Sequence, residues 1–458
     1  MRISSIGRSI AVIKQKFSQS LGLPFQEVLP ESLVDEALEA EGICYRERMF
    51  SPKVTVWGFL SQVLDKDKSC QNVVSRIIAW LASAGKPVPS SDPSAYCQAR
   101  KRLGEGVLRR LFTKVAENQQ AQVSQEQHWR GHRVVIGAGS TVVMPDTPAN
   151  QEAYPQHGTQ AEGCGFPIAR VVALFGLATG AVQELLISPW KTSELALARQ
   201  LYPRLHPNDL FLADRTFCSY GDIYLLQQQH VEVLLRMHQR RKFDFRRGKR
   251  LGKKDHLVTW TKPNSCPKGL SREIYDQLPP TLTLRELSST IEQKGFRTKH
   301  VTVVTTLLDP KRYPKVALAE LYGLRWTAEL DLRHLRSTMG MEMLTTKTPE
   351  MVRKEIYCHL LAYNLIRALM GDAALRHNVS PLRLSVQSTI RHLLNFLPQL
   401  AQAGRSKRAR LYLQLLHTVA QEEVPKRPGR YHPRVRKRRP KPYPLMNKPR
   451  HLLRERTA

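Results

Sequence analysis

The spacing of apolar residues changes near residue 130, and this change constrains the fold more than any other feature of the sequence. Upstream, between Pro24 and Val115, apolar residues recur at the spacing of amphipathic helices. Downstream, runs rich in Val, Leu, Ile and Phe are typical of strands. The predicted order is β-β-β-α-β-α-β, with strands at 133–144, 168–177, 181–188, 209–214 and 231–236 and helices at 192–205 and 220–229. This order predicts a mixed sheet covered by helices.

The chain carries a formal net charge of +32, from 71 Lys and Arg against 39 Asp and Glu. Two segments hold most of the excess: residues 426–458 contain 13 bases and one acid, and residues 236–256 contain ten bases and two acids. Each phosphate that a basic side chain neutralises releases counterions, so separated basic patches on a folded body favour a long polyanion. Nucleic acid is therefore the predicted partner. For the tail alone, a role in solubility is the alternative.

Several other classes of protein are excluded. The most apolar stretch, 171–187, contains Gln183 and Glu184 and is too short and polar to cross a bilayer. The basic runs lack the amphipathic helix or lipidation motif of a membrane-surface protein. The seven cysteines are scattered without a Cys-x-x-Cys pair, which predicts a reduced cytoplasmic chain without a disulfide framework or zinc ribbon.

The strand and helix order is that of an RNase H-like core in the α/β class, and the other regions divide around it. We predict a helical DNA-binding domain at 1–117, a core at 128–375, a helical region at 376–423 and a basic, Pro-rich tail at 424–458. Within the core, short strand-like runs and the second basic cluster predict a β-rich insertion at about 237–312. The N-terminal helices suit a helix-turn-helix unit, with a plain helical bundle as the alternative.

The segment LYGLRWTAELDLRHLRSTMG carries the side chains best suited to chemistry. On a helix at 100° per residue, one face gathers four of them within about 60°: Tyr322, Arg325, Glu329 and Arg336, with Arg333 close by. Spacing alone favours a surface lattice of i, i+4 ion pairs, each worth about 0.2–0.5 kcal/mol. In the functional alternative the carboxylate holds a divalent metal ion while the cations and the phenol hydroxyl bind phosphate oxygens.

These residues also match a known signature. The DDE insertion-sequence transposases of the IS-four group carry the pattern Tyr-x2-Arg-x3-Glu-x6-Lys, and this sequence resembles it with Arg336 in place of the final Lys. The segments MPDTPANQEAYPQ, LADRTFCSYGD, VTTLLD and KRPGRYHPRVRKRRPK resemble that group too, so the likeness covers nearly the whole chain.

The resemblance implies a catalytic site of two aspartates and one glutamate that bind two divalent ions, Mg²⁺ or Mn²⁺. By position, Asp214 matches the second aspartate and Glu329 the glutamate, so both are predicted metal ligands. Read alone, Asp214 would more often be a turn or cap residue. The resemblance further implies that Tyr322, Arg325 and Arg336 position phosphates.

The first aspartate of the family pattern is missing, because Ala138 stands where the family has Asp before Gly-Ser/Thr-Thr. A methyl group cannot bridge two metal ions, so we expect impaired strand cleavage and intact phosphate binding. The nearest acid, Asp146, is separated by roughly 26 Å of extended strand and is predicted to be a turn residue. Trp260 and Trp326 are predicted to pack in the core rather than to stack on a flipped base.

The predicted function is a bacterial, nucleoid-associated transposase that binds the inverted ends of a mobile element and target DNA, as a homodimer that pairs two ends. The alternative is a non-catalytic protein that occupies the ends and regulates transposition, and a third reading is a nucleic-acid-binding protein without end preference. Beside Arg333 and the signature residues, the predicted DNA contacts lie in the second basic cluster: Arg240, Arg241, Lys249 and Arg250.

Overall fold

A computed structural model covers the chain and describes residues 25, 28–45, 48–83, 88–267, 269–290, 300–425 and 443–454. The first 24 residues and most of the predicted basic tail, 426–442 and 455–458, lie outside the described residues. Among the helices that are described, none combines the length and apolar character needed to cross a membrane. All seven cysteines are free thiols.

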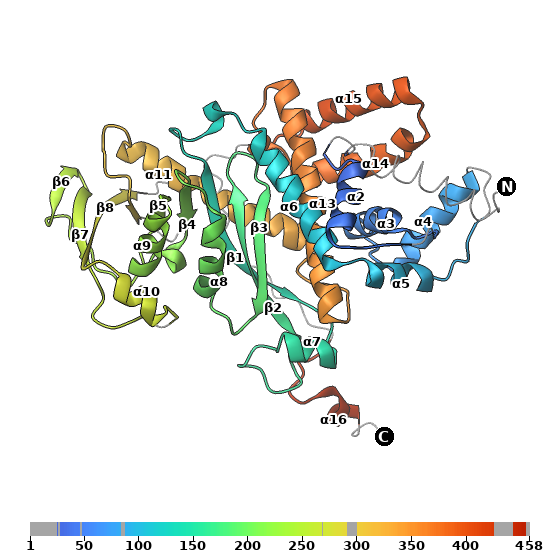
Figure 1. The fold of residues 1–458 in the computed structure, drawn as a ribbon, viewed down its shortest axis with the longest axis horizontal. Helices are drawn as coiled ribbons and strands as arrows, with labels where there is room; N and C mark the ends of the chain where they lie inside the picture. The colour runs from blue at the N-terminus through green and yellow to red at the C-terminus, as the bar shows by residue number, and fades with distance from the viewer. Residues whose placement is uncertain are drawn as a thin grey trace. The chain divides into compact units, whose positions relative to one another are not determined.

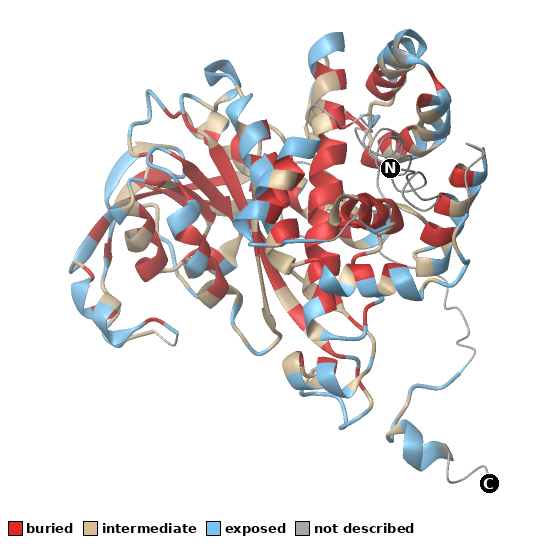
Figure 2. Ribbon diagram, turned by 45° about the vertical axis from the view of Figure 1, so that its right-hand side comes forward, coloured by how far each residue is buried: buried red, intermediate tan, exposed pale blue. Residues whose placement is uncertain are grey.

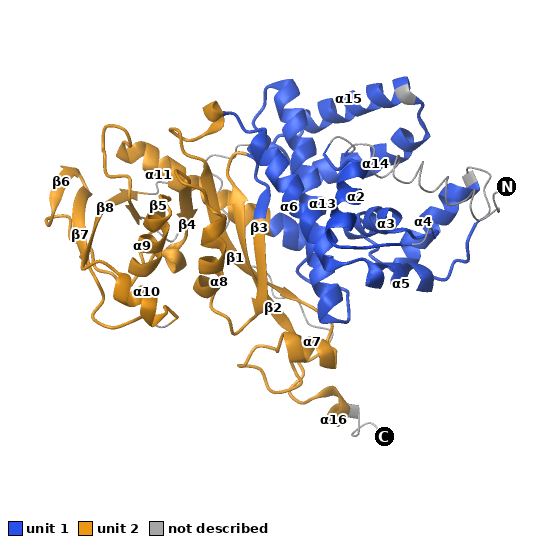
Figure 3. Cartoon of the chain, viewed as in Figure 1, with its two compact units in different colours: residues 1–124, 179–183, 333–424 blue, residues 125–178, 184–332, 425–458 orange. Residues whose placement is uncertain are grey.

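The chain divides into two compact units (Figure 3). Unit 1 comprises residues 1–124, 179–183 and 333–424, and unit 2 comprises residues 125–178, 184–332 and 425–458. Helices from the two ends of the sequence therefore belong to one unit, a grouping that sequence order does not show.

Unit 2 is built on a nine-stranded sheet in the order β3-β2-β1-β4-β5-β9-β8-β7-β6 (Figure 1). Its first five strands are β1 (Val134–Val143), β2 (Ile168–Gly176), β3 (Val182–Pro189), β4 (Leu210–Ala213) and β5 (Glu232–Arg236). Strand β1 pairs antiparallel with β2 and parallel with β4, and β4 pairs parallel with β5. This is the topology of an RNase H-like core, and it confirms the predicted fold class.

Two helices pack on one face of this sheet, α8 (Glu194–Leu201) between β3 and β4, and α9 (Tyr220–Gln228) between β4 and β5. Their apolar side chains join those of β1, β4 and β5 in one buried cluster. Gly137 of β1 permits this packing, because a Cβ there would lie 2.6 Å from the Phe211 ring. The central strands are accordingly buried (Figure 2).

The remaining strands extend the sheet beyond β5. They are β6 (Lys249–Gly252), β7 (Asp255–Thr261), β8 (Thr281–Thr290) and β9 (His300–Thr305), and all their pairings are antiparallel. Buried charge is paired within this extension: Arg285 binds Asp255 at 2.6 Å, and Trp260 Nε1 donates to Glu286 at 2.7 Å. Pairing avoids the large cost of an isolated buried charge.

The other elements of unit 2 are helices of ten residues or fewer and 3-10 turns. They are α7 (Pro148–Ala153), α10 (Arg272–Gln277), α11 (Lys315–Leu324), α12 (Trp326–Arg333), α16 (Arg450–Arg454) and the 3-10 turns η1 (Gln125–Gln127), η2 (Tyr202–Arg204) and η3 (Arg215–Phe217). Helix α11 packs against β5.

Unit 1 is helical and is organised around α13 (Pro349–His377), a 29-residue helix that is buried over most of its length (Figure 2). Helices α3, α6, α14 and α15 pack against it. The helices of unit 1 are α2 (Glu31–Ala40), α3 (Pro52–Leu64), α4 (Cys70–Ser83), α5 (Ser94–Arg102), α6 (Glu105–Ala121), α13, α14 (Val386–Gln402) and α15 (Arg405–Gln421), with a π-helix η4 (His334–Thr338) and a 3-10 turn η5 (Pro381–Arg383). The region predicted to be helical, between Pro24 and Val115, contains α2 to α5 and most of α6.

His359, in the middle of α13, is fully buried, and neither ring nitrogen has a hydrogen-bond partner among the described residues. Burial, with Lys68 nearby, holds the pKa of His359 well below its ordinary value. A His359→Leu variant is expected to be more stable than the parent chain, with a free energy of unfolding about 1–2 kcal/mol higher. The substitution removes a buried polar group that has no hydrogen-bond partner. Thermal or urea unfolding at pH 8 measures this gain.

The same substitution should also change the pH dependence of stability. The unfolded His359 binds a proton near pH 6.5 and the folded one does not, so the parent chain loses stability as pH falls below about 6.5. The gain from His359→Leu should therefore be larger at pH 5.5 than at pH 8. As a matched control, His392→Leu should give no gain, because His392 Nε2 lies 3.3 Å from Glu422. A gain for His359→Leu that stays constant with pH would contradict the assignment of a neutral buried ring.

Candidate metal and phosphate site

The parallel pairing of β1 with β4 brings Asp214 beside Ala138. The last paired residues of the two strands are Gly137 and Ala213, and Ala138 and Asp214 follow them by one residue on each strand. Side chains alternate along a strand, so these two positions share the face opposite to that of Gly137. Adjacent strands lie about 4.8 Å apart, which puts an acid at 138 and one at 214 within reach of shared ions.

Asp214 has an unsatisfied oxygen. It follows β4 directly, and its Oδ1 is buried without a hydrogen-bond partner among the described residues. Ala138 is also buried, at 8% exposure. Asp146 lies elsewhere: it follows β1, is exposed, and accepts a hydrogen bond from Gln151 Nε2 at 2.8 Å. Asp146 lies between β1 and α7, directly before Thr147, the N-cap of α7.

The segment from α11 to α12 carries the other charged groups. Arg325 caps α11, its Nη2 donates to Glu329 Oε1 at 2.7 Å, and its guanidinium lies 5.8 Å from the centre of the Tyr322 ring. Arg325 Nε and the Tyr322 hydroxyl are buried without hydrogen-bond partners among the described residues. A donor, a hydroxyl and the Asp214 oxygen are thus desolvated and unpaired, which costs free energy unless a ligand satisfies them.

Electrostatic interactions connect this segment to the end of β4. Burial raises the pKa of the Tyr322 phenol, and of the charges around it Arg325 and Arg236 lower that pKa and Asp214 raises it. Burial lowers the pKa of Arg325, but Tyr322, Glu329 and Asp214 outweigh it and leave the pKa raised. Asp214 therefore lies close enough to Tyr322 and Arg325 for their charges to interact.

Two of the cations predicted to contact DNA, Arg333 and Arg336, belong to unit 1. Arg333 is the last residue of α12, and Arg336 lies in the π-helix η4, with its Nη2 3.8 Å from Glu342. The assumption of 100° per residue through to position 336 was wrong, because a π-helix adds about one residue to the turn and rotates the residues after it. The structure does bring Tyr322, Arg325 and Glu329 together.

The second basic cluster, residues 236–256, runs from the end of β5 through β6 to the start of β7. Arg240, Lys249 and Arg250 are exposed, and Arg250 pairs with His256 across the β6–β7 hairpin. Arg241 differs, because its guanidinium stacks 3.6 Å from the centre of the Trp260 ring and burial lowers its pKa. Of the four DNA contacts predicted in this cluster, three are thus exposed, and Arg241 packs on Trp260.

The two tryptophans named in the sequence differ from each other. Trp260 is buried at 4% exposure, so its predicted core role is confirmed. Trp326, the first residue of α12, is 48% exposed, so its predicted core role was wrong. The spacing of apolar residues alone could not distinguish an exposed position for Trp326 at the start of α12 from a position in the core.

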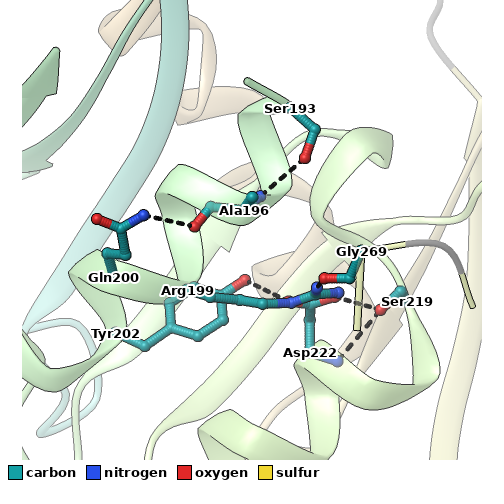
Figure 4. Close-up of polar contacts among 8 residues, drawn as sticks. All are labelled: Ser193, Ala196, Arg199, Gln200, Tyr202, Ser219, Asp222 and Gly269. Carbon is teal, nitrogen blue, oxygen red and sulfur yellow. Dashed lines mark hydrogen bonds and ion pairs between the residues drawn. The ribbon is translucent and has the colours of Figure 1, made fainter. Parts of the chain in front are cut away.

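A buried ion-pair network holds the helices that precede and follow Asp214 (Figure 4). Arg199 of α8 binds both oxygens of Asp222 of α9 at 2.9 Å, and the Tyr202 hydroxyl donates to Asp222 at 3.1 Å. Ser219 also bonds to Asp222, and Arg199 reaches the Gly269 carbonyl. Because Asp222 is completely buried, this network fixes α8 against α9 and with them the segment from Asp214 to Ser219.

Glu194 was not singled out in the sequence, yet its carboxylate lies against β1. Ser193 accepts a hydrogen bond from Ala196 N and thereby starts α8 at Glu194 (Figure 4). A Cβ at Gly139 would lie 2.2 Å from Glu194 Oε1, so the carboxylate rests directly on this glycine. Acidic residues directly after an N-cap are common, so the sequence around Glu194 did not indicate a functional site. The crossover from β3 to α8 brings Glu194 to β1, and this is visible only in the structure.

The carboxylates of this site are of the type that binds divalent ions. Carboxylate oxygens are the ligands that hard cations prefer, and the unpaired Asp214 oxygen and the half-exposed Glu329 carboxylate are of this type. Within the described ranges, however, no group of three or more His, Cys, Asp and Glu side chains is arranged to hold a metal ion. The site fits one ion bound through few carboxylates, and it lacks the bridging acid of a two-ion site.

Comparisons with known proteins identify the family of the chain. Residues 129–365 match the family described as "Transposase DDE domain", and residues 19–113 match "Insertion element 4 transposase N-terminal". The "Transposase InsG for insertion sequence element IS4" of Escherichia coli (strain K12) is 29% identical over 429 residues, which cover 92% of this chain and 93% of that protein. The "Putative transposase InsZ" of the same strain is 28% identical over 137 residues, or 30% of this chain and 46% of that protein.

Among solved structures, the piggyBac transposase in a synaptic complex with hairpin DNA aligns with a TM-score of 0.47 and 10% identity, over 87% of this chain and 85% of that one. The family match alone covers more than half of the chain and includes β1, Asp214 and Glu329. This chain belongs to the DDE-domain transposases of the insertion element 4 type.

Proposed function

We propose that this transposase binds the inverted ends of its insertion sequence and cuts and transfers DNA strands there, with activity limited by Ala138. The observation that carries the proposal is the desolvated, unpaired set formed by the Asp214 oxygen, the Tyr322 hydroxyl and Arg325 Nε. A phosphodiester and a divalent cation together would satisfy all three. Family membership implies divalent metal use, and Mg²⁺ or Mn²⁺ suits carboxylate ligands.

In this proposal the residues have separate roles. Asp214 and Glu329 would hold divalent ions, which would supply activation of the attacking oxygen and stabilisation of the leaving oxygen. Arg325 holds the Glu329 carboxylate in place at 2.7 Å and can donate its free Nε to a phosphate oxygen. Tyr322 stays protonated at neutral pH, since burial raises its pKa, and donates its hydroxyl proton to phosphate. Arg333 and Arg336 supply further phosphate contacts.

The second candidate is a protein that binds element ends without cutting them and so regulates transposition. Ala138 favours it, because a methyl group replaces the acid that would lie beside Asp214 on the sheet. We further propose that residues 1–117 read the ends and that two copies of the chain pair them, as a homodimer.

The experiment measures end binding and cleavage separately. A gel shift at fixed salt compares a cognate end with a scrambled duplex of equal length, and nicking is followed with Mg²⁺ or Mn²⁺. End preference with weak nicking that Asp214→Asn abolishes supports the transposase. End preference without any nicking supports the regulator, and equal affinity for both duplexes contradicts both candidates.

The exposed residues of the second basic cluster should contribute to the salt dependence of DNA binding. A Lys249→Gln, Arg250→Gln double variant should reduce the slope of log K against log salt by about 1.8, because each lost phosphate contact removes about 0.9. Binding is measured by fluorescence anisotropy with duplex DNA between low and physiological salt.

The control for this prediction is Arg272→Gln, which removes an equally exposed cation already paired with Asp276 on α10. Its slope should equal that of the parent chain. An unchanged slope for the double variant would place the β6 hairpin outside the DNA contact.

A further inference from the structure

The missing acid at position 138 leaves Asp214 without a neighbouring ligand on its own face of the sheet. Strand β4 ends at Ala213, so beyond Gly137 strand β1 pairs with β2 alone. The edge of β1 at Gly139 is therefore not covered by a strand on the side where Asp214 emerges. A side chain from the α8 face can approach Asp214 around the end of β4.

Glu194 is the side chain in that position. Its carboxylate rests on Gly139, where a Cβ would lie 2.2 Å from Oε1. Helix α8 also packs against η3, the turn that directly follows Asp214, so the Glu194 and Asp214 carboxylates approach the same end of β4. Two neighbouring acids in a partly buried site repel each other unless a cation lies with them.

Resting on the proposed function, we infer that Glu194 and Asp214 together hold one divalent cation, so that Glu194 supplies the ligand that position 138 lacks. Two carboxylates suffice, because Mg²⁺ is commonly bound by one or two carboxylates and completes its shell with water and phosphate oxygens. The inference also explains why a glycine occupies position 139, because any side chain there would displace the Glu194 carboxylate.

Gly139→Ala provides an independent test of the position of the carboxylate. The atoms that a new methyl group would meet are the far end of the flexible Glu194 side chain, so the side chain can move at little cost to the fold. The variant keeps the negative charge and moves it away from β1. Glu194→Gln instead removes the charge and keeps the shape.

Mn²⁺ binding to the full chain without DNA, followed by the EPR signal of free Mn²⁺, is the readout. The parent chain should bind one Mn²⁺ that Asp214→Asn releases, and Glu194→Gln and Gly139→Ala should each weaken it about tenfold or more. The matched control is Glu273→Gln, since Glu273 lies in the first turn of α10 behind the N-cap Ser271, as Glu194 does behind Ser193. Its affinity should equal that of the parent.

Parent-like Mn²⁺ affinity in both Glu194→Gln and Gly139→Ala would overturn the inference and would mean that Glu194 only balances the charge of Arg170. A parent chain without an Asp214-dependent Mn²⁺ site would overturn it as well. Neither result bears on the preference for element ends, which the gel shift measures without metal, so failure of this inference and failure of the proposed function are distinguishable. Circular dichroism of each variant checks that the fold is kept.

Discussion

Ala138→Asp is expected to increase Mg²⁺-dependent nicking of a cognate end by about 100-fold or more over the parent chain. That factor corresponds to about 2.7 kcal/mol of transition-state stabilisation. The reason is geometric: position 138 and Asp214 each follow the last β1–β4 pair by one residue, so a new carboxylate there would lie beside Asp214 and would serve as a further ligand for divalent ions. The measurement is the initial rate of nicking with saturating end DNA.

Three controls separate this effect from a general change. Ala138→Asn has nearly the same shape as Asp without the charge and should give no gain. Adding Glu329→Gln to Ala138→Asp should abolish nicking and leave end binding unchanged. Without divalent ions, Ala138→Asp should lower the melting temperature, because its carboxylate faces that of Asp214, and Mg²⁺ should restore it. A rate equal to that of the parent would mean that position 138 is not part of the cleavage site.

Asp222→Ala is expected to lower the free energy of unfolding of unit 2 by about 3–5 kcal/mol. Removing the acid leaves the Arg199 guanidinium, whose side chain is 14% exposed, without its partner in a low-dielectric site. The Tyr202 hydroxyl and the Ser219 side chain also lose their acceptor. Urea unfolding gives the stability, and hydrogen exchange of β4 and α9 shows where protection is lost.

Asp276→Ala is the matched control, since Arg272 binds Asp276 at 3.1 Å but both side chains are more than half exposed. An exposed pair of this kind contributes less than about 1 kcal/mol. Asp222→Asn, which keeps the size and some hydrogen bonds, should fall between the two. A loss for Asp222→Ala as small as that for Asp276→Ala would show that the network does not hold α8 against α9.

The sequence predicted the core well because its signals are local. Strand and helix periods placed β1 to β5, α8 and α9 within a few residues, and short crossovers restrict the topology of such an order. The part of the site carried by α11 and α12 was predictable for the same reason, since Arg325 and Glu329 are i, i+4 neighbours. The position of Arg336 was not predictable, because the π-helix rotates it and no residue type in the segment HLRST indicates an extra residue in the turn.

By itself, the sequence determined the order of elements, the positions of the basic segments, the signature residues and the absence of an acid at 138. These follow from residue type and short-range spacing, which fix backbone period, burial and charge. The tertiary structure alone decided that Asp214 emerges beside Ala138, that Glu194 rests on Gly139, and that Arg241 packs on Trp260 while its neighbours stay exposed. Such contacts join residues on different elements, and they depend on strand register and on where β4 ends, which no local pattern encodes.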